Sequence, residues 1–280
     1  MKLSMNQATC LEKSSLEKDL ELCEKYGYDM IEPRTMDGIP NYLKNHTIDE
    51  LAAWFKSHKV KPLAFNTLCF FNNRTPEDYQ KVLQELRQMC EWGKKIGCKT
   101  IITVPTVDLK KVTRQEIHKS AVKCLKEMGE IAAEYGMRIS VEFIGHPAAS
   151  INTFGEAWSV IEDVDMDNVG ITLDCFHFHG MGSKLEDLAK ADGKKIFIVH
   201  LNDTEDFPIG CSMRPASGLA MAASTLTLSS RRSRRSAGRK MSSRSSSSVR
   251  NTTRWTRKMS IASARRSPKR SSSAISELCR

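Results

Sequence analysis

Short apolar runs alternate with longer segments of helical periodicity along the first 210 residues. The runs are bounded by polar or turn-forming residues, as buried strands are. The longer segments repeat their apolar positions every three or four residues, as amphipathic helices do. The pattern predicts strands at 2–9, 28–31, 60–65, 99–104, 138–141, 169–173 and 196–199. It predicts helices at 16–26, 47–58, 75–96, 113–135, 152–163 and 185–190.

This alternation predicts an α/β fold in which crossover helices connect parallel strands. Seven strand–helix units nearly fill a TIM-type (β/α)8 barrel, so we expect an incomplete barrel of seven strands within residues 1–210. The alternative is an open, doubly wound sheet. No G-x-G-x-x-G or P-loop pattern follows any predicted strand, which weakens that alternative.

Three consecutive predicted strands end in a residue that can bind a metal ion: Glu142, Asp174 and His200. Neighbouring strands lie about 4.8 Å apart, so three such side chains can reach one ion at the barrel mouth. Two carboxylates and an imidazole suit zinc, manganese or cobalt. Each residue alone is better explained as an ordinary polar residue of a loop or site. Their matching positions favour a site for one divalent metal ion.

Other polar residues near strand ends are candidates for the same mouth. His177 follows Asp174 by three residues, and we expect it to contact substrate oxygens. Residues at earlier strand ends that either line the pocket or have a structural role are Glu32, Arg34 and Asn66. Residues with a less specific signal are His146 and His179, which fit loop packing as well as function, and Asp203, which could orient a metal ligand.

Six segments resemble the xylose-isomerase-like barrels, a superfamily of sugar phosphate isomerases, epimerases and endonuclease-type relatives, and most closely its inosose isomerases. The segments occur in order as M-K-L-S-M-N-Q-A-T, Y-D-M-I-E-P-R-T-M-D, F-F-N-N-R, V-E-F-I-G-H-P, N-V-G-I-T-L-D-C-F-H-F-H and V-H-L-N-D-T-E-D-F-P-I-G. The resemblance covers residues 1–210 nearly continuously and ends at Gly210.

The resemblance implies one divalent metal ion held by four side chains, three of which correspond to Glu142, Asp174 and His200. It implies that His177 contacts a small-molecule substrate, a keto-cyclitol or keto-sugar. In such enzymes the metal stabilises an enediolate while two glutamates move a proton between adjacent carbons. Glu142 corresponds to one of these glutamates. The other, which is also the fourth metal ligand, is expected on the eighth strand.

The balance of charged residues changes at Gly210, where the resemblance ends. The net charge is +10, but residues 1–210 contain 26 basic and 32 acidic residues. Residues 211–280 contain 20 serines, 14 arginines and the single acid Glu277, with no apolar pattern that predicts a strand. This segment fits a nucleic-acid-binding tail, a disordered tail or an out-of-frame translation. We favour the last, because reading the codons out of frame permits short peptide sequences that resemble the family. We therefore expect the activity of this chain to be impaired.

Composition narrows the remaining choices of cell location and enzyme class. There is no apolar run near 18 residues and no signal-peptide pattern, so we expect a cytoplasmic protein without a membrane span. The nine cysteines lack paired spacing, which is typical of reduced thiols in a core. A metal-dependent endonuclease of the same barrel type is the alternative enzyme. It would need more metal ligands and a basic face, whereas residues 1–210 are acidic.

Overall fold

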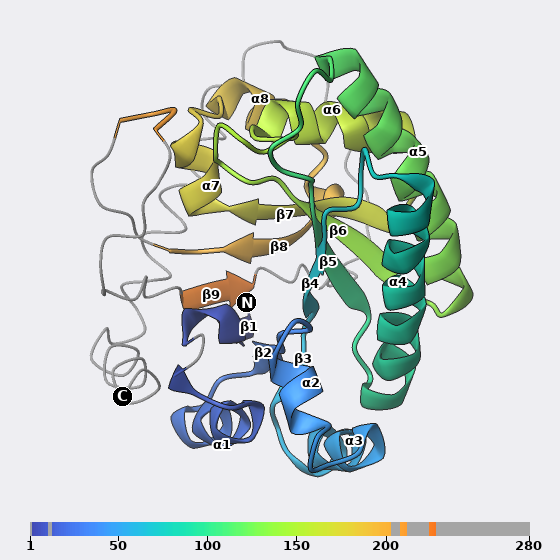
Figure 1. Cartoon of the computed structure of the whole chain (residues 1–280). Coiled ribbons are helices and arrows are strands. Elements are labelled where there is room, and N and C mark those ends of the chain that lie inside the picture. The colour runs from blue at the N-terminus through green and yellow to red at the C-terminus, as the bar shows by residue number, and fades with distance from the viewer. Residues whose placement is uncertain (1, 11–12, 203–207, 212–223, 228–280) are drawn as a thin grey trace, which may run out of the picture.

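The computed structural model describes residues 2–10, 13–202, 208–211 and 224–227, which form the wall of a barrel surrounded by helices (Figure 1). The parallel strands are β1 (Lys2–Asn6), β2 (Met30–Glu32), β3 (Lys61–Pro62), β4 (Phe65–Cys69), β5 (Thr100–Val104), β6 (Arg138–Glu142), β7 (Val169–Asp174) and β8 (Ile196–His200). The fold is an α/β barrel of the TIM type, as predicted.

The barrel wall consists of two sheets. Strands β4 to β8 form one parallel sheet in chain order, and β3, β2 and β1 begin the other. A parallel bridge between Arg34 and Asn66 links the end of β2 to β4. Strand β9 (Ser224–Thr227) runs antiparallel to β1 and lies between β1 and β8 (Figure 1). The prediction that residues 211–280 contain no strand is therefore wrong at these four residues.

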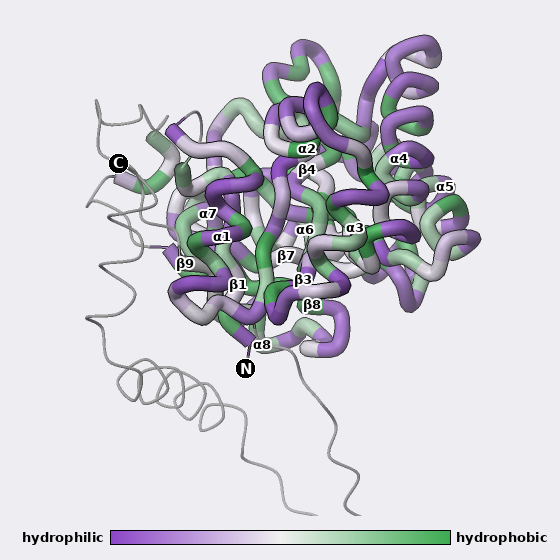
Figure 2. The backbone as a smooth tube through the Cα atoms, turned by 90° about the horizontal axis from the view of Figure 1, so that it is seen from below, coloured by the Kyte–Doolittle hydropathy of each residue, from purple (hydrophilic) through white to green (hydrophobic). Residues whose placement is uncertain are grey.

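The helices follow the strands and cover the outside of the wall. They are α1 (Leu16–Tyr26), α2 (Gly38–Tyr42), α3 (Ile48–Ser57), α4 (Pro76–Ile96), α5 (Arg114–Glu134), α6 (Phe154–Val164), α7 (Cys175–Gly180) and α8 (Leu185–Lys190). Thr47 and Thr113 begin α3 and α5 with capping boxes, and Thr75 caps α4 ahead of Pro76. Figure 2 shows hydrophilic and hydrophobic positions alternating around the turns of α4 and α5, as amphipathic helices require.

The third predicted strand differs most from the structure. Residues 60–65 do not form one strand: β3 ends at Pro62, and β4 begins at Phe65. The chain nevertheless stays beside β2 across this break, since the N–H of Leu63 donates to the carbonyl oxygen of Ile31 at 2.8 Å. Asn66 therefore lies within β4 rather than after a strand end. Helices α2 and α7 were not predicted, since each is too short to show helical periodicity.

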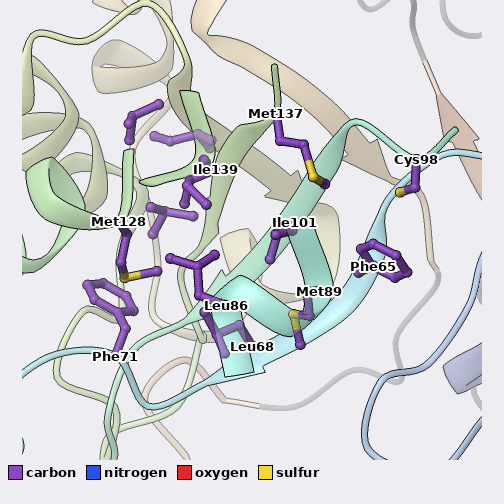
Figure 3. Close-up of a cluster of buried hydrophobic side chains, with 14 of the residues drawn as sticks. Phe65, Leu68, Phe71, Leu86, Met89, Cys98, Ile101, Met128, Met137 and Ile139 are labelled. Carbon is purple, nitrogen blue, oxygen red and sulfur yellow. The ribbon is translucent and has the colours of Figure 1, made fainter. Parts of the chain in front are cut away.

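The core lies between the strands and the helices that cover them. Figure 3 shows Leu86 and Met89 of α4 packed with Ile101 of β5 and Ile139 of β6. These side chains are fully buried. Free thiols are part of the same core, as expected from the sequence: Cys23, Cys90, Cys98 and Cys124. None of the helices in the described part of the chain has the length and apolar composition that a membrane span requires.

Candidate metal centre

The ends of β6, β7 and β8 bring together the three residues that the sequence singled out. These strands are parallel neighbours, and their register pairs Asp174 with His200 and Glu142 with Thr172. All three side chains are at least nine-tenths buried: Glu142, Asp174 and His200. Buried ionisable groups are costly unless they are paired or bind a ligand, so their shared position needs a compensating interaction.

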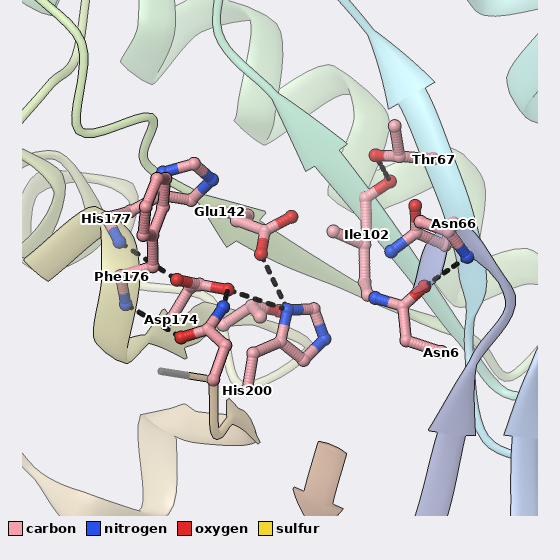
Figure 4. Close-up of polar contacts among 12 residues, drawn as sticks. Asn6, Asn66, Thr67, Ile102, Glu142, Asp174, Phe176, His177 and His200 are labelled. Carbon is pink, nitrogen blue, oxygen red and sulfur yellow. Dashed lines mark hydrogen bonds and ion pairs between the residues drawn. The ribbon is translucent and has the colours of Figure 1, made fainter. Parts of the chain in front are cut away.

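Nδ1 of His200 is the meeting point of the three groups (Figure 4). It lies 2.7 Å from Oε1 of Glu142 and 3.5 Å from Oδ2 of Asp174. Asp174 is fixed at both oxygens. Asn202 donates its side-chain amide to Oδ2 at 2.8 Å, and the backbone N–H of His177 donates to Oδ1 at 2.9 Å. The carboxylate of Asp174 thus caps α7 while it faces His200.

The other ring nitrogen of His200 faces the opposite sheet. Nε2 lies 3.1 Å from Oε2 of Glu32, at the end of β2. Glu32 has no exposed surface, and its Oε1 has no hydrogen-bond partner. The side-chain amide of Asn66 donates to Oε2 of Glu32 at 3.5 Å. One imidazole is therefore held between carboxylates from β2 and from β6.

The electrostatics of this cluster favour a bound cation. Burial opposes the charge on His200, but Glu32 and Glu142 together raise its pKa well above the ordinary value. Burial likewise opposes ionisation of Asp174, but the hydrogen bond with His200 and the charge of His177 lower its pKa. Three carboxyl groups and one imidazole thus share a buried space, and this is a donor set that suits a divalent cation.

His177 lies beside this cluster on the first turn of α7. Its donor atom and those of Glu142 and Asp174 lie within 4.8 Å of one another. Nδ1 of His177 is buried and has no hydrogen-bond partner. A buried imidazole nitrogen without a partner is uncommon and indicates a binding group that the protein itself does not satisfy. His177 is therefore positioned to contact a ligand of the centre.

The remaining sequence candidates lie apart from this group or outside the described residues. Arg34 forms a bidentate ion pair with Asp37, with distances of 2.6 and 3.0 Å. Nδ1 of His146 accepts the backbone N–H of Ala148 within its own loop. His179 lies in α7, and Asp203 is outside the described residues.

Sequence reasoning missed Asn202, which holds both Asp174 and the backbone N–H of Phe176. The sequence could have indicated Asn202, because a side-chain amide two residues beyond a strand-end histidine can reach the neighbouring loop.

Comparison with known proteins places this geometry in a family. The family model described as "Xylose isomerase-like TIM barrel" matches residues 20–220. The inosose isomerase of Halalkalibacterium halodurans is 53% identical over 210 residues, covering 75% of this chain and 74% of the relative. That of Bacillus subtilis is also 53% identical over 210 residues, covering 75% and 76%.

A solved structure supports the same relationship. The crystal structure of the IolI protein with a binding zinc atom superposes with a TM-score of 0.74 at 53% identity, covering 75% of this chain and 76% of that one. The family match spans most of the chain, and the relatives share more than half of their aligned residues with it. This chain therefore belongs to the xylose isomerase-like TIM barrel family.

Proposed function

We propose that this chain is a divalent-metal-dependent isomerase that moves a proton between adjacent carbons of a keto-cyclitol, with inosose as the substrate. The observation that carries the proposal is the buried group in which Nδ1 of His200 meets the carboxylates of Glu142 and Asp174. Identity of 51–53% to four inosose isomerases supports the substrate class. The zinc atom of the IolI structure supports the metal.

The donor set fits a metal ion. Ligand atoms about 2.1 Å from a tetrahedral ion lie about 3.4 Å from one another. The 3.5 Å between Nδ1 of His200 and Oδ2 of Asp174 matches this value, whereas the 2.7 Å to Oε1 of Glu142 is a direct hydrogen bond that would have to lengthen around an ion. Glu142, Asp174 and His200 would hold the ion, and zinc, manganese and cobalt all accept such a set. In the bound state the ion supplies a Lewis acid that stabilises negative charge on the substrate oxygens.

The side chains around the ion would handle the proton and orient the substrate. We assign Glu142 as the base that takes the proton from the carbon next to the carbonyl. We assign His177 to a substrate oxygen, because its buried Nδ1 has no partner within the protein. Arg34 and Asn66 remain pocket candidates. An endonuclease is less well supported, because residues 1–210 carry 26 basic and 32 acidic residues, a balance that does not favour a nucleic-acid substrate.

Proton exchange provides the sharpest test, because it needs only one base. The purified chain, loaded with zinc, manganese or cobalt, is incubated with inosose in deuterium oxide, and deuterium uptake next to the carbonyl is followed by NMR. We expect uptake that requires the metal and falls in Glu142→Gln but not in Glu127→Gln, a matched change on α5. Uptake that is unchanged by metal removal and by Glu142→Gln would contradict the proposal.

The same assay should distinguish the role of His177 from that of His200. Replacing His200 with alanine should weaken metal binding, because it removes a ligand. Replacing His177 with alanine should raise KM and leave metal affinity nearly unchanged, because it removes a substrate contact. The reverse result would exchange the two assignments.

We also propose that residues 211–280 are an out-of-frame translation and that 1–210 is the barrel unit. Each inosose isomerase match spans 210 residues and three-quarters of both chains, so the remaining quarter of this chain lies outside it. Its composition of 20 serines and 14 arginines is unlike the acidic body. The chain would then lack the glutamate expected on the strand that follows β8, and full isomerisation would be slower by about 10²–10⁴-fold.

The coding DNA around the Gly210 codon tests this second proposal. One restored base should yield an acidic, strand-forming C-terminus and should recover isomerisation. A reading frame that stays Arg/Ser-rich after every single-base correction would contradict it. Nucleic-acid binding is the competing function of the segment, and it predicts salt-dependent binding by residues 211–280 alone. For the body we propose a cytoplasmic location, consistent with its buried free thiols.

A further inference from the structure

Both ring nitrogens of one buried histidine are engaged, and by carboxylates from different sheets. Nδ1 of His200 faces Glu142 at 2.7 Å, and Nε2 faces Glu32 at 3.1 Å. His200 is 3% exposed and Glu32 is 0% exposed. If Nδ1 binds a metal ion through its lone pair, the proton of the neutral ring must be on Nε2. The carboxylate of Glu32 lies where it would accept that proton in a hydrogen bond.

The position of Glu32 argues against direct contact with substrate. It lies in β2 opposite Asn6, and both residues are buried. Its polar contacts are with His200 and with the side-chain amide of Asn66. Because Oε2 is engaged by His200 and Asn66 and the side chain is fully enclosed, the carboxylate is placed to hold the ring rather than to meet substrate. Burying a carboxylate costs free energy unless the group is paired or accepts hydrogen bonds. The contact with Nε2 of His200 is the interaction that offsets this cost at Glu32.

We propose that Glu32 is a positioning residue that holds the Nε2–H of His200 and so directs Nδ1 toward Glu142 and Asp174. The inference rests on the proposed function, since it assigns Glu32 a task at the same centre. A metal-binding histidine commonly donates its other N–H to a carboxylate, which fixes the tautomer and the orientation of the ring. Here that carboxylate comes from β2, on the opposite side of the barrel interior from β7.

Zinc affinity is the first readout, because it does not depend on turnover. Zinc binding to the full chain is measured by competition with a chromophoric chelator for the wild type, Glu32→Gln, Glu32→Leu and Glu127→Gln. Loss of such an outer carboxylate typically lowers metal affinity about 10–100-fold. We expect Glu32→Gln to bind more weakly by this factor and Glu32→Leu more weakly still, because leucine also removes the acceptor. Glu127→Gln, at a half-buried position on α5, should bind like the wild type.

Imidazole NMR is the second readout, and its first measurement needs only the wild type. In the zinc-loaded wild type with ¹⁵N-labelled histidine, the His200 ring should carry its proton on Nε2, and that proton should exchange slowly with water. A proton on Nδ1 would overturn the inference. In Glu32→Gln the Nε2 proton should exchange faster, which a merely space-filling role would not produce.

The outcomes separate the two proposals. Wild-type binding of zinc with equal affinity in Glu32→Gln would overturn the positioning role and leave the proposed function standing. Failure of the wild type to bind zinc, manganese or cobalt would overturn both. Should Glu32→Leu fail to fold, the isosteric Glu32→Gln and the wild-type tautomer still decide the question.

Discussion

The two sheets of the barrel wall differ in strand direction and strand length. Strands β4 to β8 follow one another in chain order, all parallel, and carry three of the clustered residues at their ends. The other sheet contains the two-residue strand β3 and the antiparallel strand β9. It contributes a single carboxylate to the cluster, that of Glu32. The all-parallel sheet thus carries the direct ligand candidates, although its β7–β8 pair shifts register between Ile171 and Thr172, and the other sheet contacts the far side of the His200 ring.

This difference indicates a division of labour across His200. Its Nδ1 belongs to the group formed by the five-stranded sheet, and its Nε2 contacts the four-stranded sheet. Damage to the first sheet should therefore affect the reaction directly. Damage to the second should affect stability or the orientation of the ring. Each of the following changes tests one side of this comparison.

The largest effect is expected from Glu142→Gln in the five-stranded sheet. Removing a general base typically lowers the rate about 10²–10⁴-fold. Deuterium uptake into inosose should fall by that factor, and metal affinity should also decrease, because the residue is a candidate ligand. Uptake is measured at saturating metal so that the two effects separate. A loss of less than tenfold would move the catalytic base to another residue.

A stability effect that depends on pH is expected from the four-stranded side. Asp19 of α1 accepts hydrogen bonds from Gln7, just after β1, and from Ser14. Gln7 in turn accepts the backbone N–H of Arg34, just after β2. Burial is the main cause that raises the pKa of Asp19 from 3.8 to about 6. This buried carboxyl therefore ties α1 to the ends of two strands.

The folded chain holds a proton on Asp19 at pH values where the unfolded chain has lost it. The free energy of unfolding should thus fall as pH rises from about 4 to about 6, by on the order of 2–3 kcal/mol. Asp19→Asn should remove this fall, so its advantage over the wild type should grow across that interval. Urea unfolding of both proteins at several pH values measures it. A constant difference between them would show that Asp19 titrates normally.

A smaller effect is expected where the loop after β6 meets α7. A Cβ on Gly145 would lie 2.2 Å from the backbone oxygen of His177, so one of the two backbones must shift. Gly145→Ala should destabilise the chain by about 1–3 kcal/mol and displace His177. Thermal unfolding measures the first effect, and KM for inosose the second. Gly193→Ala is the control, since no atom lies within 4 Å of its added Cβ; equal effects would refute the steric argument.

The all-parallel sheet was also the more predictable. Strand ends at Glu142, Asp174 and His200 could be located because each follows a mostly apolar run, interrupted only by the small hydroxyl residues Ser140 and Thr172. The contact between His200 and Glu32 could not, since it joins residues 168 positions apart across the interior. Short elements such as α7 were missed because six residues show no period. The strand β9 was missed because its residues carry no apolar pattern that distinguishes them from their surroundings.

The smallest effects are expected from a matched pair of helix caps. Thr47 begins α3, which precedes the irregular strand β3, and Thr113 begins α5, which precedes β6. Both threonines form the same capping box, so each substitution by alanine should cost about 1 kcal/mol of unfolding free energy. Equal costs in urea unfolding are expected if both sheets unfold as one cooperative unit. A cost at Thr113 without one at Thr47 would indicate that the α3 region opens before the rest. In that case amide hydrogen exchange should be faster in β2 than in β6, and the contact between Glu32 and His200 would open before the contact between Glu142 and His200.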